Sequence, residues 1–539
     1  MGSIGWWIKD PIPLKWRRVW TAIASEHAPW LKFVAFYVIF ANLPYWIVAR
    51  EFGFRDLGWF CVQYVTVGLI ALAAPRVVAA GLLFAVMIAD LLCGVCFTFN
   101  LPVRECLLNL NVAHAFTGYR LLCVIAVGLL ALLAAATAAL LPGKTLSRAQ
   151  RLQAAASLVA FAALIVGADS LSIRIATGHL PAFFKTPHLQ DGTDHDWFNV
   201  SRLTRIPLIR LARLQVAEGG INSFDKGGPA SAYPASSATA AAMRGEGIPQ
   251  GGSNGDLPNV VLVMVESWGL AIDAPLKEAL VEPYLQANVN AKYEVIRGSV
   301  PFHGPTIPGE GRELCGSAIG FHLLTAPAAD LRSCLPDRLA ALGYDTIAVH
   351  GMSGHMFNRS TWYSTIGFRE RWFHEQLQQQ GLPDCSGVFS GTCDADIAGW
   401  IGRRLEEDGS RPKFIHWMTL NSHLPVPVPS YLPNGAPCLA TLGLHPNSAL
   451  CSWYQLVANV HRSVAQLATG PLSRSTVFVI VGDHAPPFGD PELHSRFSQS
   501  DVPYVVLLPR SQKDPSKSML AHNAANPAPG LTQHPRQLP

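Results

Sequence analysis

The sequence has few charged residues and no strong excess of either sign. Of its 539 residues, 14% are Asp, Glu, Lys or Arg, and the formal net charge is +4. So small a net charge argues for neither a nucleic-acid partner nor an acidic tail. Half of the residues are hydrophobic and the mean hydropathy is +0.23. The apolar excess lies in the first third of the chain, which predicts a membrane region.

We also expect no cleavable signal peptide, because the first apolar run follows a long polar tail and lacks a small-residue cleavage site. Five apolar segments are long enough to cross a bilayer, at residues 33–49, 58–74, 77–97, 121–141 and 154–173. Lys and Arg are concentrated in the N-terminal tail and in the loop after the fourth segment, which places the N-terminus in the cytoplasm. We therefore expect a five-helix membrane domain over 1–173, with the rest of the chain on the outer side.

The junction at 174–256 carries two features of interest. Segment 202–213 has four arginines among Leu and Ile and predicts an amphipathic helix from about Pro207, lying at the membrane interface or packed on the soluble domain. Segment 217–256 is rich in Gly, Ala and Ser and predicts a flexible tether. Asp90 lies within the third apolar segment. A carboxylate at this depth is expected either to serve a function, to pair with another helix or to reach the membrane interface.

Residues 257–510 predict an α/β domain with a largely parallel sheet. Continuous apolar, β-branched runs typical of buried parallel strands occur at 259–265, 346–350, 414–420, 476–481 and 502–508. Helical patterns at 335–342 and 454–468 lie between them. Sites in such sheets form beyond the carboxyl ends of the strands, and Glu266, His423, Asp483 and His484 follow strand ends. The polar segment 511–539 predicts a disordered tail.

Thr306 stands in a Pro- and Gly-rich turn directly before a predicted helix start. Unpaired N–H groups and the helix dipole make that position favourable for a phosphate. The hydroxyl of Thr306, the carboxylates of Glu266 and Asp483 and the imidazole of His484 are donors suited to one divalent cation, Mn²⁺, Mg²⁺ or Zn²⁺. Each residue has an ordinary alternative, such as an N-cap for Thr306. Their joint placement favours a metal-activated threonine nucleophile.

The cysteines divide between the two parts of the chain. Five lie in the membrane third, and an even number, six, lie in the α/β domain. Six cysteines allow 15 pairings, of which we favour Cys315–Cys334, Cys385–Cys393 and Cys438–Cys451. Disulfides persist outside the cytoplasm, so this prediction agrees with the predicted topology.

Five short motifs carry a resemblance to a known group of proteins. They are VMVESWG at 263–269, TIPG…CG at 306–316, FNR at 357–359, NSH at 421–423 and GDH at 482–484. They resemble the alkaline-phosphatase superfamily, and within it the membrane phosphoglycerol transferases: lipoteichoic acid synthases and periplasmic glucan phosphoglycerol transferases. Phosphoethanolamine transferases form a neighbouring branch.

The resemblance implies a helical membrane domain followed by an alkaline-phosphatase-like α/β domain, in the inner membrane of a bacterium with the catalytic domain in the periplasm. It implies one metal held by Glu266, Thr306, Asp483 and His484, Thr306 as nucleophile, and substrate contacts from Asn358, Arg359 and His423, with His423 protonating or orienting the leaving oxygen. A phospholipid would be the donor and a glycan the acceptor. Gly309 and Gly311 depart from the family pattern, since they weaken the helix after Thr306.

Several alternatives stay open on the sequence. We expect phosphatidylglycerol as donor because Arg359 can bind its phosphate, whereas the ammonium of phosphatidylethanolamine would need a carboxylate such as Glu310 or Glu313. A hydrolase or a glycan-binding protein without activity would use the same fold. CLPDR at 334–338 fits a minimal sulfatase pattern but lacks the Thr-Gly that completes it. His416 lies within a predicted strand and is expected to be a core residue. Weaker candidates for the site are His303, His350, His355 and His494.

Overall fold

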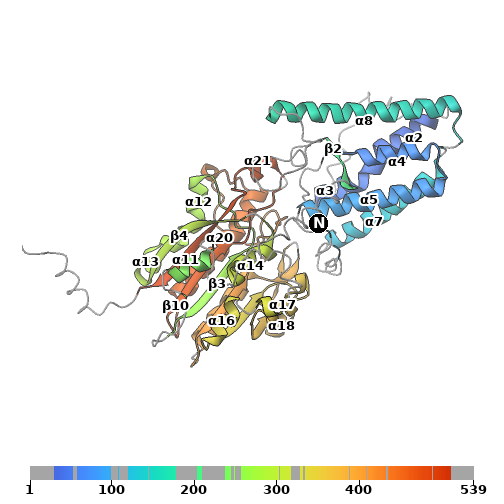
Figure 1. Ribbon diagram of the computed structural model, residues 1–539. Coiled ribbons are helices and arrows are strands. Elements are labelled where there is room, and N and C mark those ends of the chain that lie inside the picture. The colour runs from blue at the N-terminus through green and yellow to red at the C-terminus, as the bar shows by residue number, and fades with distance from the viewer. Residues whose placement is uncertain are drawn as a thin grey trace, which may run out of the picture.

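The computed structural model describes residues 29–52, 58–98, 103, 107, 119–141, 143, 145–177, 203–208, 237–244, 248, 257–302, 304–316, 328–331, 334–387, 389–407, 410–432, 435–488 and 490–510. Figure 1 shows two groups of elements along the chain, a set of helices in blue and cyan and an α/β domain in green to red. The predicted tail at 511–539 and most of the predicted tether lie outside the described residues.

The N-terminal group is helical, as predicted. It contains α2 (Pro29–Val38), η1 (Phe40–Asn42), α3 (Leu43–Phe52), α4 (Val62–Ala71), α5 (Arg76–Thr98), α7 (Tyr119–Leu140) and α8 (Arg148–Thr177), with the two-residue strands β1 (Phe60–Cys61) and β2 (Thr204–Arg205). Among the described residues, three stretches are long and apolar enough to cross a membrane: Pro29–Ala49, Arg76–Cys96 and Arg148–Leu171. Val62–Ala71 and Ile125–Leu140 are shorter apolar helices. The five-span topology therefore stays a prediction.

Asp90 on α5 pairs with an arginine from far along the chain. Arg205 is 1% exposed, and its Nη2 lies 2.7 Å from the Asp90 carboxylate. The same guanidinium donates to Asn42 and to the backbone carbonyls of Gly58 and Trp59. Arg205 belongs to the arginine-rich segment 202–213 but precedes the helix predicted from about Pro207, and it lies in β2, which pairs in parallel with β1. Of that predicted helix, residues 209–213 lie outside the described residues.

The second group is built on a seven-stranded sheet in the order β4-β11-β10-β3-β9-β5-β6. Its strands are β3 (Asn259–Val265), β4 (Tyr293–Pro301), β5 (Asp345–His350), β6 (Glu370–Trp372), β9 (Lys413–Met418), β10 (Thr476–Gly482) and β11 (Asp501–Pro509). All five predicted strands are present, and β10, β3, β9, β5 and β6 run parallel. β11 is antiparallel to both of its neighbours. The sequence did not predict β4, an edge strand in which buried and half-buried residues are interspersed with exposed ones.

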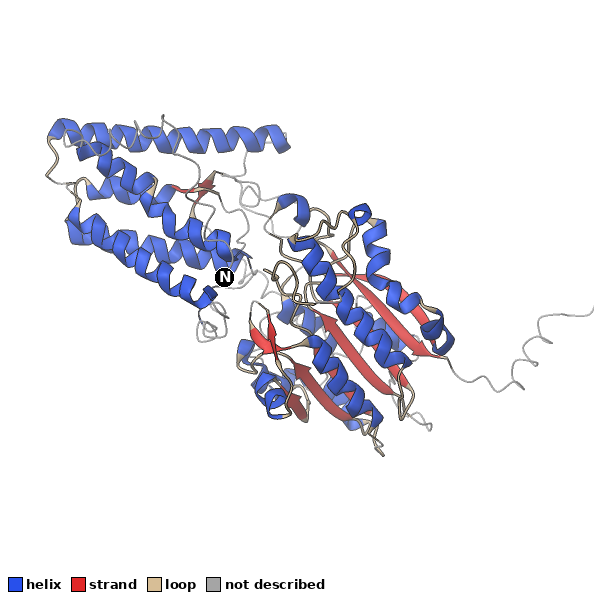
Figure 2. Ribbon diagram, turned by 180° about the vertical axis from the view of Figure 1, so that it is seen from behind, coloured by secondary structure: helices blue, strands red, loops and turns tan. Residues whose placement is uncertain are grey.

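Helices cover both faces of this sheet, as Figures 1 and 2 show. One face packs against α12 (Ala274–Val281), α13 (Ala287–Lys292), α19 (Asp394–Glu406) and α20 (Ala449–Thr469). The other packs against α11 (Ala238–Arg244), α14 (Thr306–Cys315), α16 (Leu335–Ala341) and α17 (Arg359–Thr365). Shorter elements are η4 (Glu282–Leu285), α15 (Ala328–Leu331), η6 (Met356–Asn358), α18 (His374–Gln379), the hairpin β7 (Asp384–Ser386) and β8 (Ser390–Thr392), η7 (Ala440–Leu442) and α21 (Pro491–His494). The predicted helices at 335–342 and 454–468 are confirmed by α16 and α20.

The structure corrects part of the predicted tether. Residues 238–244 form α11, whose Ala238 and Ala242 belong to the hydrophobic core of the α/β domain. The carboxylate of Glu313 on α14 accepts hydrogen bonds from the backbone N–H groups of Ala238 and Thr239. A carboxylate at these unpaired N–H groups stabilises the start of the helix. The α/β domain therefore includes a segment before residue 257.

The six cysteines of the α/β domain lie in the three pairs predicted, each at disulfide distance: Cys315–Cys334, Cys385–Cys393 and Cys438–Cys451. The first pair joins the C-terminus of α14 to the residue before α16. Cys334 is the first residue of the CLPDR pattern, and it is 1% exposed. A paired, buried cysteine there disfavours the sulfatase nucleophile.

Candidate active site and metal centre

Three predicted metal ligands converge at the carboxyl ends of two neighbouring strands. β3 and β10 pair in parallel, so Glu266 after β3 and Asp483–His484 after β10 reach the same edge of the sheet. One ligand atom from each of Glu266, Asp483 and His484 lies within 4.8 Å of the others. Their chain order and the parallel register together build the cluster that the sequence predicted.

The charges of the cluster fit a cation. Burial raises the pKa of Glu266 well above its usual range, and the adjacent carboxylate of Asp483 raises it further. Glu266 is 3% exposed and Asp483 fully buried. Two buried carboxylates that face each other repel, and a divalent cation between them relieves both the repulsion and the cost of burial. With an imidazole as third donor, the residues present fit Mn²⁺, Mg²⁺ or Zn²⁺.

Hydrogen bonds to neighbouring groups hold these ligands in place. Asp483 Oδ1 accepts from the backbone N–H groups of Ser267 and His484, at 2.7 and 2.6 Å. The Ser267 hydroxyl donates to Glu266 Oε1 at 2.8 Å. His484 Nδ1 donates to the carbonyl of Ala485, which turns Nε2 toward Glu266 and Asp483, at 3.4 and 3.3 Å. Fixing a ligand's second nitrogen in this way orients the ring for a metal.

Thr306 is the first residue of α14, and its hydroxyl donates to Asp483 Oδ2 at 3.1 Å. The predicted nucleophile is therefore in direct contact with a predicted metal ligand. β4 delivers the chain to this position, because it ends at Pro301, five residues before Thr306. The structure thus brings all four predicted metal-binding residues together.

Gly309 has a different role from the one expected. α14 runs unbroken from Thr306 to Cys315 despite two glycines. A Cβ atom on Gly309 would lie 3.0 Å from the carbonyl oxygen of Asp483, which is closer than ordinary van der Waals contact. The glycine therefore allows the nucleophile's helix to approach the end of β10.

Arg359 is buried, which the sequence did not predict. It is 2% exposed, and its Nε and Nη2 donate to Glu310 Oε1 at 3.0 and 2.6 Å. Burial favours the neutral form of Glu310, but Arg359 and His416 outweigh it and lower the pKa of Glu310 to about 2. The positive charge of Arg359 also lowers the pKa of Glu266, and so partly opposes the rise caused by burial and by Asp483. The guanidinium therefore lies within electrostatic reach of the candidate metal ligand Glu266.

The other predicted contact residues differ in placement. His423 is half-buried, packs edge-on against Phe389 and donates from Nδ1 to the carbonyl of Leu424 at 2.7 Å. Burial, with the charge of His484, lowers the pKa of His423 to about 4, so its ring is neutral at pH 7. Asn358 is exposed and accepts a hydrogen bond from Thr361. The described contacts of Asn358 give it a local role at the start of α17.

The remaining histidines are placed as follows. His416 is fully buried between Tyr363 and Phe368, which confirms the predicted core residue. His350 ends β5, is buried and hydrogen-bonds through Nδ1 to the carbonyl of Met418. His355 is exposed and His494 ends α21. His303 lies outside the described residues.

Sequence reasoning missed Glu310 as a site residue and considered it only as a partner for an ammonium. One signal was available: Glu310 lies four residues after Thr306 on a predicted helix, so the two share a face. This spacing did not predict Arg359 as the partner of Glu310, because Arg359 lies on α17, 49 residues further along the chain.

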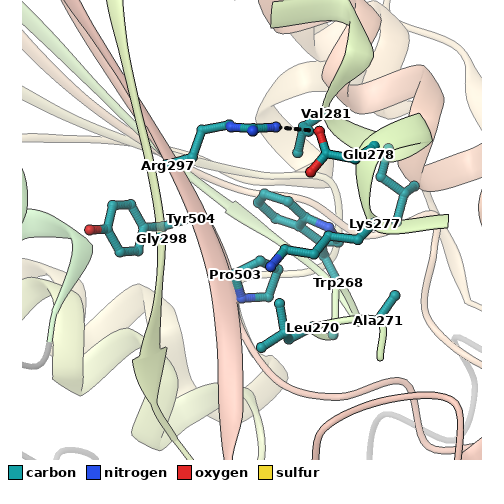
Figure 3. Close-up of a pocket in the computed structure, with 12 residues that line it drawn as sticks. Trp268, Leu270, Ala271, Lys277, Glu278, Val281, Arg297, Gly298, Pro503 and Tyr504 are labelled. Atoms are coloured by element: carbon teal, nitrogen blue, oxygen red, sulfur yellow. Dashed lines mark hydrogen bonds and ion pairs between the residues drawn. The ribbon is translucent and has the colours of Figure 1, made fainter. Parts of the chain in front are cut away.

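A cavity of about 230 Å³ lies on the sheet face covered by α12. Trp268, residues of α12 and parts of β4 and β11 line it. Figure 3 shows the Arg297 guanidinium reaching the Glu278 carboxylate, a pair 2.7 Å apart. None of the predicted site residues lines this cavity. The candidate site is therefore defined by the converging side chains and not by this cavity.

Comparison with known proteins agrees with the architecture. The sulfatase family model matches residues 258–532, which is just over half of the chain. The chain belongs to the sulfatase family, a branch of the alkaline-phosphatase superfamily, and the predicted superfamily is confirmed.

Solved structures to which the chain is similar include the lipoteichoic acid synthase LtaP from Listeria monocytogenes, at 14% identity and a TM-score of 0.35, covering 48% of this chain and 66% of that one. The Streptococcus pyogenes phosphoglycerol transferase GacH, in complex with sn-glycerol-1-phosphate, matches at 14% identity and a TM-score of 0.31, covering 46% and 67%. The C-terminal periplasmic domain of EptC from Escherichia coli, in complex with Zn, matches at 14% and 0.31, covering 48% and 74%. This chain thus spans slightly less than two thirds of the LtaP structure's length. No curated protein matches the sequence.

Proposed function

We propose that this protein transfers the phosphoglycerol headgroup of phosphatidylglycerol to a glycan outside the cytoplasm, through a covalent intermediate on Thr306. The observation that carries the proposal is the contact of the Thr306 hydroxyl with Asp483, inside the cluster of Glu266, Asp483 and His484. A hydroxyl that shares a carboxylate with a metal-ligand cluster is placed to become a nucleophile.

A divalent cation bound by Glu266, Asp483, His484 and Thr306 would lower the pKa of the Thr306 hydroxyl and offset the negative charge of the phosphate. Thr306 Oγ1 then forms a bond to phosphorus, the bond from phosphorus to the diacylglycerol oxygen breaks, and diacylglycerol leaves with the proton that Thr306 gives up. The N–H groups at the start of α14 face the phosphate oxygens.

In the second step the oxygen of a sugar hydroxyl forms a bond to the same phosphorus, the bond from phosphorus to Thr306 Oγ1 breaks, and Thr306 regains a proton. His423 is suited to this step. Its Nδ1 donates to the carbonyl of Leu424, so Nε2 of the neutral ring is a hydrogen-bond acceptor. We propose that Nε2 takes the proton of the sugar hydroxyl. We propose this role in place of protonation of the leaving oxygen, because a neutral ring whose Nδ1 donates carries no proton on Nε2.

The surroundings of two carboxylates support phosphoglycerol over phosphoethanolamine. Glu310 and Glu313 were the groups that could have met an ammonium, and both are fully buried. Glu310 is paired with Arg359, and Glu313 with Arg312 and the start of α11. Neither carboxylate is left for a cationic headgroup.

The apolar helices and the three cysteine pairs support an extracytoplasmic catalytic domain on a membrane anchor. Three stretches are long enough to span a bilayer, and disulfides persist outside the cytoplasm. A membrane anchor brings the site to a lipid donor. In a bacterium with two membranes, we place the anchor in the inner membrane and the catalytic domain in the periplasm.

The test is incubation of the full-length protein, in vesicles of phosphatidylglycerol or of phosphatidylethanolamine with Mn²⁺, followed by mass spectrometry of the peptide that contains Thr306. We expect a glycerophosphate adduct from phosphatidylglycerol and none in Thr306→Ala. An ethanolamine phosphate adduct would overturn the donor. Release of free headgroup to water at the full rate, without transfer to any glycan, would identify a hydrolase.

A further inference from the structure

Glu310 connects the nucleophile's helix to the arginine expected at the donor phosphate. It lies on α14 four residues after Thr306 and is fully buried. Arg359 and Tyr363 lie one turn apart on α17, so both point from the same face of that helix. Arg359 donates twice to Glu310 Oε1, and the Tyr363 hydroxyl donates to Glu310 Oε2 at 2.7 Å. Each oxygen of the carboxylate is thus occupied by α17.

These hydrogen bonds to Glu310 involve only two of the three guanidinium nitrogens of Arg359. Nε and Nη2 of Arg359 bind Glu310, whereas none of the side-chain hydrogen bonds seen among the described residues comes from Nη1. Nη1 is also not among the described side-chain nitrogens that are buried without a partner. A guanidinium has a fixed planar shape, so holding two of its nitrogens also fixes the direction of the third. Nη1 is therefore the nitrogen available to a ligand.

We propose that Glu310 is a positioning residue for the donor: with Tyr363, it holds Arg359 so that Nη1 meets the donor phosphate beside Thr306. Because Glu310 and Thr306 share a face of α14, the same helix sets both the nucleophile and the direction of the phosphate-binding arginine. The inference rests on the proposed function, and it extends that function to a residue that does not touch the substrate.

The alternative is an ion pair that only stabilises the fold. The chain offers a matched control for it, because Glu313 on the same helix is also fully buried and ion-paired, with Arg312 at 2.7 Å. Glu313 binds the start of α11 and not α17. Glu310→Gln and Glu313→Gln therefore both remove a buried charge from α14, but only the first affects Arg359.

Four quantities are compared in full-length wild type, Glu310→Gln and Glu313→Gln: the KM and kcat for phosphatidylglycerol in vesicles, the affinity for sn-glycerol-1-phosphate by calorimetry, and the affinity for Mn²⁺. Glu310→Gln should raise KM and weaken glycerophosphate binding by about tenfold, with a smaller change in kcat. Mn²⁺ binding should be unchanged. Glu313→Gln should lower the melting temperature and leave KM unchanged.

Tyr363→Phe keeps the test valid if Glu310→Gln does not fold. It removes one hydroxyl and should raise KM about two- to fivefold without loss of kcat. Equal effects of Glu310→Gln and Glu313→Gln on KM, or an unchanged glycerophosphate affinity in both Glu310→Gln and Tyr363→Phe, would overturn the positioning role. Absence of a Thr306 adduct in wild type would instead overturn the proposed function, and the glycerophosphate affinities would still decide the role of Glu310.

Discussion

Each of the two parts of this protein contains a buried arginine paired with an acid from a distant segment. In the helical part Arg205 pairs with Asp90, 115 residues away, and in the α/β domain Arg359 pairs with Glu310, 49 residues away. Both arginines are at most 2% exposed. Burying such a pair costs much of what its attraction returns, so the burial alone does not distinguish a structural role from a functional one.

The use of the guanidinium nitrogens does distinguish them. Arg205 donates from Nε to Asp90, from Nη1 to the carbonyls of Gly58 and Trp59, and from Nη2 to Asn42 and Asp90. Every nitrogen of Arg205 has a partner, whereas the hydrogen bonds that Arg359 makes to described residues come from Nε and Nη2 and not from Nη1. A fully satisfied arginine holds segments together, and one with a nitrogen to spare can also bind a ligand.

The largest effect is expected at the nucleophile, where a substitution should remove activity with little loss of stability. Thr306→Ala should lower turnover of phosphatidylglycerol by at least about a thousandfold. It should change the free energy of unfolding by at most about 1–2 kcal/mol, the contribution of a hydroxyl at a helix start. Turnover assays and thermal melting of the same preparation measure both. Product formation at the wild-type rate would remove Thr306 from the mechanism.

At Arg205 we expect the opposite result, a large loss of stability with little loss of activity. Arg205→Met leaves the Asp90 carboxylate buried without its cation and should destabilise the helical part by about 3–5 kcal/mol. Turnover per folded molecule should stay near wild type. The combination of Arg205→Met with Asp90→Asn removes both charges and should recover part of the stability. Heating the detergent-solubilised variants and following the folded fraction tests this, and a single variant as stable as wild type would contradict it.

A third buried acid, Asp394, has no arginine partner in the part of the chain that the structure describes, and it should respond to pH in the opposite sense from Glu310. Its carboxylate accepts backbone hydrogen bonds from Leu420 and Asn421. Burial nonetheless raises the pKa of Asp394 to about 7, whereas Arg359 helps lower that of Glu310 to about 2.

The folded state thus holds the proton of Asp394 more tightly than the unfolded state does. Its contribution to stability is present below about pH 4 and is lost as the pH rises toward about 7, by at most about 4 kcal/mol. Chemical denaturation between pH 4 and 8 measures the slope. Asp394→Asn should flatten that slope, and an unchanged slope would show that Asp394 is not its source.

The smallest effect is expected from packing between the nucleophile's helix and the metal ligands. Gly309→Ala places a Cβ atom 3.0 Å from the Asp483 carbonyl, so α14 must shift by a few tenths of an ångström. Since catalysis depends on near-contact geometry, kcat should fall roughly tenfold. The matched control is Gly399→Ala on α19, where the nearest atom is Arg403 Nη1 at 3.9 Å. That change should leave kcat unchanged and stabilise the helix by up to about 1 kcal/mol, and equal kcat values in the two variants would contradict the packing argument.

The sequence by itself determined the five inner strands of the sheet and the grouping of the candidate metal ligands, because both depend on local pattern. A continuous apolar run such as 259–265 is buried on both faces wherever it lies in a parallel sheet. Residues that directly follow such runs, such as Glu266 and Asp483, must then meet at one edge. The cysteine pairs Cys385–Cys393 and Cys438–Cys451 were predictable for a related reason, since their partners are close in the chain.

Only the tertiary structure decided which nitrogens and oxygens remain available for chemistry. Periodicity placed Glu310 on the face of Thr306 but gave no partner for it, and composition placed Arg205 near the membrane but not against Asp90. Gly309 read as a weak point in a helix until the carbonyl of Asp483 was found beside it. The physical reason is common to all three: a pattern fixes which way a side chain faces along its own segment. The atoms that it meets belong to segments tens to hundreds of residues away, and their approach is set by packing of the whole fold.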